Sequence, residues 1–214
     1  AAVTEGIKAA LASIRNRFED TGNPEIEAAK GPDTNLEFHN RVHTQDVMER
    51  TRRILEAMGA SERRVRLGEL LAASHDTVQG FQDKKRERDG AIMRDRFVIR
   101  NEMASAQELL GYMVRMNKEN EKKGLKSAFT EEEMAIVMPG IESTVPDWDM
   151  ANKTVKQPNF LSGIKETLGQ QLNSNSLELV KRALALADLG TAGMDGPGKY
   201  LPEGNKIFHE ENLD

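Results

Sequence analysis

Apolar residues recur three and four positions apart along most of the 214-residue chain, which is the period of an α-helix. We find no convincing alternation of apolar and polar residues and no internal repeat, so the pattern predicts an all-α fold. The apolar positions that we expect to face the core are, segment by segment, Ile7, Leu11, Ile14 and Phe18; Val47, Ile54, Leu55 and Met58; Leu67, Leu70 and Leu71; Ala106, Leu109, Leu110 and Met113; Met134, Ile136, Val137 and Ile141; and Leu177, Val180, Leu184 and Ala187.

Capping and helix-breaking residues divide these segments. Ser61 is a good N-cap, and Thr130 followed by Glu133 forms a capping box. We expect helices at about 40–58 and 100–116, a short helix at 161–172, an Asn/Ser cap at 173–176 and an end to regular helix at the glycines from 190 onward. The segments expected to be irregular are 22–37, the highly charged 81–97, the polar 119–126, and 145–160.

Composition fits one soluble domain. The chain is 38% hydrophobic and 30% charged, and no linker-like stretch divides it, so we predict a single domain over 1–214 with a core at about 36–190, an N-terminal helix and a C-terminal tail. The absence of cysteine excludes disulfides, thiolate zinc sites and a cysteine nucleophile.

Charge and hydropathy limit the partners. A net charge of −5 argues against bulk binding of nucleic acid. No apolar run reaches the length of a membrane span and no apolar signal region opens the sequence, so we expect a cytoplasmic protein that acts on a small molecule. A homodimer is compatible with these features.

Three of the four histidines fall in two short segments. His39 and His43 are four positions apart and share one face of a helix, whereas His75 and Asp76 are adjacent at the end of an apolar run. A fourth group, Asp188, closes the apolar stretch 183–187, where an isolated charge would be very costly. Imidazole and carboxylate together are ligands for a divalent metal ion.

His43, His75, Asp76 and Asp188 would form a site of two histidines and two carboxylates. Four protein ligands leave room for water or substrate on an octahedral ion, which favours Mn, Fe, Co, Ni or Mg over a closed structural zinc site.

The order His, His-Asp, Asp on separate predicted helices resembles the HD-domain metal-dependent phosphohydrolases. The likeness spans about 36–190 and is strongest to small bacterial HD hydrolases, whose His-Asp pair precedes an Asn-Glu-x-x-Ser-Ala phrase. That phrase is matched by 101–106, and an Ala-Asp-Leu-Gly helix end is matched by 187–190. The resemblance implies an HD-domain helical bundle with irregular loops, with His43, His75, Asp76 and Asp188 as the metal ligands.

The resemblance also assigns catalytic roles. His39 falls where related phosphodiesterases place a histidine that donates a proton to the leaving group, Asp76 belongs to the metal site, and Glu102 is a second candidate for proton transfer. The structural alternatives are a hydrogen bond at a helix start for His39 and a first-turn acid favoured by the helix dipole for Glu102.

Basic residues near the predicted metal site are candidates for binding substrate phosphate. An alternative for the run 84–88 is a solvated loop, because acids are interleaved with the bases. The candidates are Lys84, Lys85, Arg86, Arg94 and Arg100.

These features predict a phosphohydrolase, either a phosphomonoesterase or a phosphodiesterase, that uses metal-activated water on a nucleotide or other small phosphate ester. The chain lacks the additional histidines of two-metal members, so we expect one divalent ion. Two alternatives stay open: a metal-binding HD module without turnover, and an iron-dependent oxygenase of the same fold.

Overall fold

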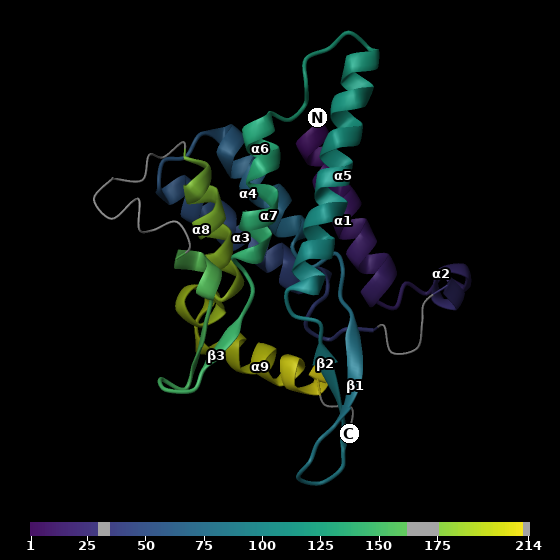
Figure 1. Cartoon of the computed structure of the whole chain (residues 1–214), viewed down its shortest axis with the longest axis vertical. Coiled ribbons are helices and arrows are strands. Elements are labelled where there is room, and N and C mark those ends of the chain that lie inside the picture. Colours follow the sequence, from purple (N-terminus) through teal and green to yellow (C-terminus); the bar gives the residue numbers. More distant parts are fainter. Residues whose placement is uncertain (30–34, 162–175, 212–214) are drawn as a thin grey trace.

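The computed structural model describes residues 1–29, 35–161 and 176–211, and within them the chain is mostly helical (Figure 1). The helices are α1 (Ala2–Phe18), α2 (Pro24–Ala29), α3 (Arg41–Ala57), α4 (Glu62–Ser74), α5 (Arg100–Lys122), α6 (Glu131–Ala135), α7 (Val137–Glu142), α8 (Leu177–Asp188) and α9 (Pro197–Glu211). Two short antiparallel hairpins join them: β1 (Phe81–Lys85) with β2 (Ile92–Arg96), and β3 (Asp147–Asp149) with β4 (Thr154–Lys156).

The core lies where α4 packs against α1, α3, α7 and α8. Every residue of α4 from Leu67 to Ser74 is buried, Glu69 included, so this part of the helix is covered on all sides, as expected of a central helix. The predicted inward positions are mostly buried; Met58 is an exception, because it lies beyond the last turn of α3 and is 49% exposed. The helical core therefore confirms the mostly helical class.

The predicted helix starts are confirmed. The Thr130 side chain accepts a hydrogen bond from the Glu133 amide while Glu133 caps the Thr130 amide, and the Ser176 hydroxyl accepts from the Glu178 amide. Ser61 occupies the N-cap position of α4. The Thr130–Glu133 and Ser176 signals identify helix starts because they satisfy backbone donors that the helix leaves unpaired, whereas the Ser61 side chain makes no capping hydrogen bond.

The prediction of irregular structure at 81–97 and 145–160 is wrong for the strands in them. Both hairpins are short, and the first has an exposed charged surface, so neither carries the apolar alternation that marks a half-buried strand. The first hairpin turns at Gly90, whose φ of +77° suits glycine, with the Gly90 amide bonded to the Arg86 carbonyl.

Helix is also more extensive than predicted. The segment 22–37 contains α2, α5 continues through 119–122, and the glycine-rich stretch after Gly190 forms a π-helical turn at Thr191–Asp195 followed by α9. Gly198, Pro202 and Gly204 lower the helix propensity of α9, which is held by its packing on β2 and on the π-helical turn (Figure 1). The short helix predicted at 161–172 falls almost entirely outside the described residues.

Within the described ranges, none of the helices combines the length and apolar character that a membrane crossing requires.

Candidate metal centre

Three helix ends bring two imidazoles and a carboxylate together. His43 lies in the first turn of α3, His75 caps the C-terminus of α4, and Asp188 is the last residue of α8. Their candidate ligand atoms lie within 4.8 Å of one another, and Asp188 Oδ1 is 3.4 Å from Nε2 of each histidine. This buried group could bind a metal ion.

Asp76 completes the cluster from the residue after His75. Its Oδ2 lies 2.9 Å from His75 Nε2 and 3.5 Å from His43 Nε2, so it faces the same point between the imidazoles as Asp188 does. Its Oδ1 turns away and accepts a 2.7 Å hydrogen bond from the Gln79 amide. The four predicted ligands are thus neighbours, from segments up to 145 residues apart in the sequence (43 to 188).

The His75 imidazole is set up as an acceptor. His75 Nδ1 lies 2.7 Å from the Ala72 carbonyl, which can only accept, so this nitrogen carries a hydrogen and the lone pair of neutral His75 is on Nε2. Nε2 of His75 and Nε2 of His43 are buried without a hydrogen-bond partner among the described residues. A backbone carbonyl that holds the far nitrogen of a histidine is the usual support for a metal-binding imidazole.

The separations within the cluster also fit a cation. Ligands about 2.1 Å from one ion are themselves about 3 Å apart, close to the spacing of these nitrogen and oxygen atoms. A cation would satisfy the unpartnered imidazole nitrogens and offset the two buried carboxylates, whose burial is otherwise costly. The residues present therefore fit a divalent metal ion.

Electrostatics couple the four groups. Burial lowers the pKa of His43 and of His75, but attraction to Asp188 and Asp76 outweighs it and raises both pKa values. Burial would raise the pKa of the Asp76 and Asp188 carboxyls, but the adjacent imidazoles hold both below their ordinary value. Both carboxylates are consequently anionic near neutrality, as metal ligation requires.

Hydrogen bonds to neighbouring backbone position two of the ligands. The Asn40 side chain accepts hydrogen bonds from the amides of Val42 and His43, which caps α3 and fixes the turn that carries His43. At the end of α8, the buried Arg50 donates to the Ala187 carbonyl and pairs with Asp195, so the residue before Asp188 is anchored to α3.

Glu102, a predicted catalytic residue, is buried, and Arg96 links it to Asp76 of the cluster. Arg96 of β2 pairs with Glu102 Oε1 at 2.8 Å and with Asp76 Oδ1 at 3.3 Å, and its Nε donates to Gln79. The other carboxylate oxygen of Glu102 is buried without a hydrogen-bond partner in the described part of the chain. Arg96 thereby connects Glu102, near the start of α5, with Asp76 of the His-Asp pair.

His39 lies beside the candidate ligand cluster and is held by α9. Its ring centroid is 6.1 Å from that of His43, with the Phe38 ring packed against both imidazoles. His39 Nδ1 pairs with Glu210 Oε1, while Glu210 Oε2 accepts from the amides of Phe38 and His39 at 2.8 and 3.1 Å. Burial opposes the ionised form of Glu210, but these bonds outweigh it and lower the pKa of Glu210.

The five predicted substrate cations lie outside this cluster. The Arg94 guanidinium stacks over Phe81, Arg86 pairs with Asp89, and Arg100 stacks over Phe97 at the surface. Lys84 and Lys85 are exposed on β1. Their assignment to substrate stays a prediction, and four of them share a groove that is described below.

Sequence reasoning missed Arg96 and Glu210. Arg96 lies in a segment that was expected to be a loop, and the many charged residues around it gave no reason to single it out. Glu210 lies in a segment that we took for an irregular tail, and only the helical continuation after the glycines places it at the site. No local pattern marks either residue, because each reaches the site through tertiary packing.

Comparisons of the chain with protein-family models, with curated proteins and with solved structures gave no match. The candidate site therefore rests on its own geometry.

Proposed function

We propose that this protein is an HD-type, divalent-metal-dependent phosphohydrolase that acts on a nucleotide or another small phosphate ester. The observation that supports this most is the buried convergence of His43, His75, Asp76 and Asp188, in which neither imidazole Nε2 has a hydrogen-bond partner among the described residues. Their order along the chain is the order in which HD phosphohydrolases carry their ligands.

Each residue at the site has a defined task in this proposal. His43, His75, Asp76 and Asp188 would hold the ion, which when bound lowers the pKa of water and polarises a phosphoryl oxygen. Arg96 pairs with Oδ1 of Asp76, so that Oδ2 of Asp76 stays turned toward the imidazoles. Its guanidinium also places a fixed positive charge beside the point where a phosphate would bind.

Two groups are placed to move protons. His39 is the donor to the leaving-group oxygen, and the carboxylate of Glu210 orients its ring. Glu102 has one carboxylate oxygen free of hydrogen bonds among the described residues and can accept a proton. In the sequence, His39 precedes all four ligands, whereas Glu102 lies in α5 between Asp76 and Asp188.

The test is a hydrolysis screen of nucleotides and sugar phosphates with protein stripped by EDTA and then reloaded with Mn, Fe, Co, Ni or Mg. We expect release of phosphate or nucleotide that is lost with EDTA and restored by at least one of the ions. His75→Ala and Asp76→Ala should remove it, whereas His209→Ala changes an exposed histidine and should not.

Full activity of the EDTA-stripped protein would refute the metal-dependent mechanism. Stoichiometric metal retained by both His75→Ala and Asp76→Ala would refute the assignment of the ligands. Tight metal binding without turnover of any ester would instead identify a metal-binding module.

A further inference from the structure

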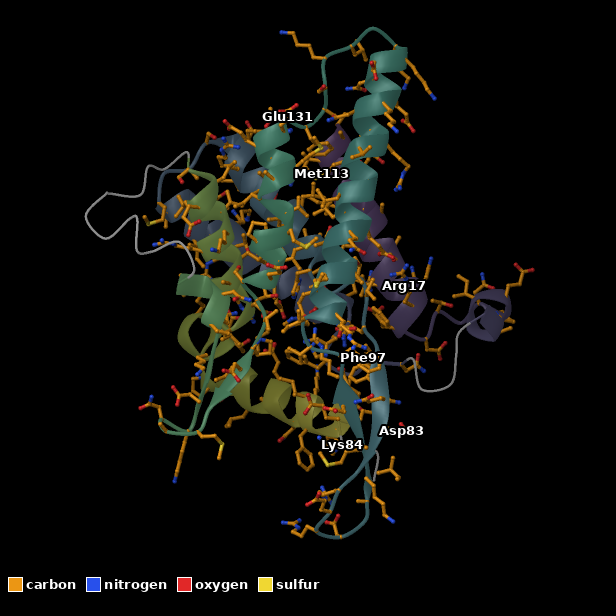
Figure 2. The ribbon with its side chains drawn as sticks, viewed as in Figure 1. Arg17, Asp83, Lys84, Phe97, Met113 and Glu131 are labelled. Carbon is orange, nitrogen blue, oxygen red and sulfur yellow. The ribbon has the colours of Figure 1, made fainter. Side chains whose placement is uncertain are left out.

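A basic groove lies between the β1–β2 hairpin and the C-terminal end of α9. Its volume is about 510 Å³, within the range of small-molecule sites. Five cationic side chains and three carboxylates line it: Lys84, Lys85, Arg86, Arg94 and Arg96, with Glu87, Asp95 and Glu211. Figure 2 shows the hairpin, labelled at Asp83 and Lys84, extending from the helices beyond Phe97. An anionic ligand fits this surplus of positive charge in a chain whose net charge is −5.

Strand geometry places three of the cations on one face of the hairpin. Side chains alternate along a strand, and directly paired residues share a face, so the pairs Phe81 with Arg96, Asp83 with Arg94 and Lys85 with Ile92 lie on the same side. Lys85, Arg94 and Arg96 therefore form a row. Lys85 is four strand positions from Arg96 and hence about 13 Å along the strand at about 3.3 Å per residue.

Arg96 joins this row to the candidate metal centre. Its guanidinium is 3.3 Å from Asp76 Oδ1, and Asp76 is itself in contact with His75. Glu211, which lines the groove, follows Glu210, which holds His39. One end of the row thus lies at the metal cluster, and the other end carries Lys85, an exposed lysine with no carboxylate partner among the described residues.

We propose that the groove binds a second phosphate group of the substrate, separated from the scissile one by an organic core, as in a nucleoside bisphosphate. This inference rests on the proposed hydrolase function and specifies its substrate class. A row about 13 Å long is too extended for two phosphates joined directly as a diphosphate, and it suits two phosphates that a ribose separates, one on its 3′ oxygen and one on its 5′ oxygen. Arg96 is the cation nearest the scissile phosphate, and Lys85 contacts the distal one.

The first test measures anion binding without turnover. Isothermal titration calorimetry of the EDTA-treated full chain with adenosine 3′,5′-bisphosphate should show binding that Lys85→Gln weakens about tenfold, the effect of losing a hydrogen bond between charged groups. Lys122→Gln removes an equally exposed lysine at the far end of α5 and should leave the binding constant unchanged. Absence of binding, or equal weakening by both variants, would overturn the groove assignment.

The second test compares adenosine 3′,5′-bisphosphate with adenosine 5′-monophosphate in the metal-loaded protein. The ratio of their kcat/KM values should favour the bisphosphate and fall about tenfold in Lys85→Gln but not in Lys122→Gln. An unchanged ratio in Lys85→Gln would refute the second-phosphate site while leaving the hydrolase intact. Binding of the bisphosphate that depends on Lys85, in a protein that hydrolyses no ester, would refute the proposed function alone.

Discussion

Glu210 joins two segments that are 171 positions apart and covers the start of α3. Its carboxylate accepts hydrogen bonds from the amides of Phe38 and His39 and pairs with Nδ1 of the His39 ring. The Glu210 side chain is almost fully buried. A carboxylate in this position fixes both the location and the tautomer of an imidazole. We therefore regard Glu210 as a positioning residue for His39.

Glu210→Gln should lower kcat about 10- to 100-fold, the usual range for a residue that supports a site without touching the reacting atoms. Metal content should stay at the wild-type level, because Glu210 contacts none of the four ligands in the described contacts. Glu37→Gln makes the same chemical change at an exposed position nearby and serves as the control. Loss of metal together with activity would show that Glu210 has a structural role instead.

A second buried carboxylate contributes to stability. Glu133 bonds the Arg63 guanidinium at 2.7 and 2.8 Å and caps the Thr130 amide. Burial alone would raise the pKa of Glu133, but these bonds outweigh it and lower the pKa from its ordinary 4.5. A lowered folded-state pKa stabilises the protein above pH 4.5, and this contribution is lost as pH falls below that value.

Glu133→Gln should therefore reduce the free energy of unfolding by about 1–2 kcal/mol at pH 7. The difference from the wild type should shrink as the pH is lowered from 5 toward the lowered pKa. Urea unfolding at a series of pH values measures it, and Glu132→Gln in the same helical turn, where the side chain is exposed, is the control. A difference that does not change with pH would contradict the ionic origin of the effect.

At the scale of elements, the close packing of α3 against α4 determines how near His43 comes to His75. Gly68 lies at this contact, and a Cβ atom there would be 2.4 Å from the Leu55 side chain and 3.1 Å from Thr51. Leu55 and Thr51 are fully buried and have little room to move. Glycine at position 68 thus allows α3 and α4 to approach closely, although glycine has a low helix propensity.

Gly68→Ala should destabilise the protein by about 1–3 kcal/mol through overpacking, despite the higher helix propensity of alanine. Gly111→Ala is the matched change in α5, where a Cβ atom would meet only the end of Arg115, and it should stabilise by about 0.5–1 kcal/mol. Thermal or urea unfolding of the two variants gives the comparison. Equal effects of the two changes would contradict the tight α3–α4 contact.

The success of prediction from sequence differed between elements for physical reasons. Helix starts such as Thr130–Glu133 could be predicted because a cap is a local interaction between near neighbours. The hairpin at 81–96 could not, because its exposed strands have no apolar face to reveal their period. Helix α9 was missed because its glycines and proline argue against helix, while the packing that holds it comes from distant segments.

At the scale of the whole molecule, the candidate site depends on the folded core. His43, His75 and Asp188 could be predicted as neighbours because each lies at one end of a helix with an apolar face, His43 at the start of its helix and the other two at the ends of theirs. Their order in the sequence also resembles that of a known superfamily. Arg96 and Glu210 could not, since β2 and α9 bring them to the site from outside the helical core. The single domain, the homodimer, the cytoplasmic location and the substrate cations stay predictions.

The central claim is that α3, α4 and α8 bring their ends together to hold a divalent ion. Elemental analysis of the protein purified without added chelator, then equilibrated with Mn or Fe and desalted, tests it most directly. We predict about one divalent ion per chain in the wild type and in His209→Ala, and at least about a tenfold loss of affinity in His75→Ala and in Asp188→Ala. A wild-type protein that retains no metal, or variants that retain as much as the wild type, would contradict the claim.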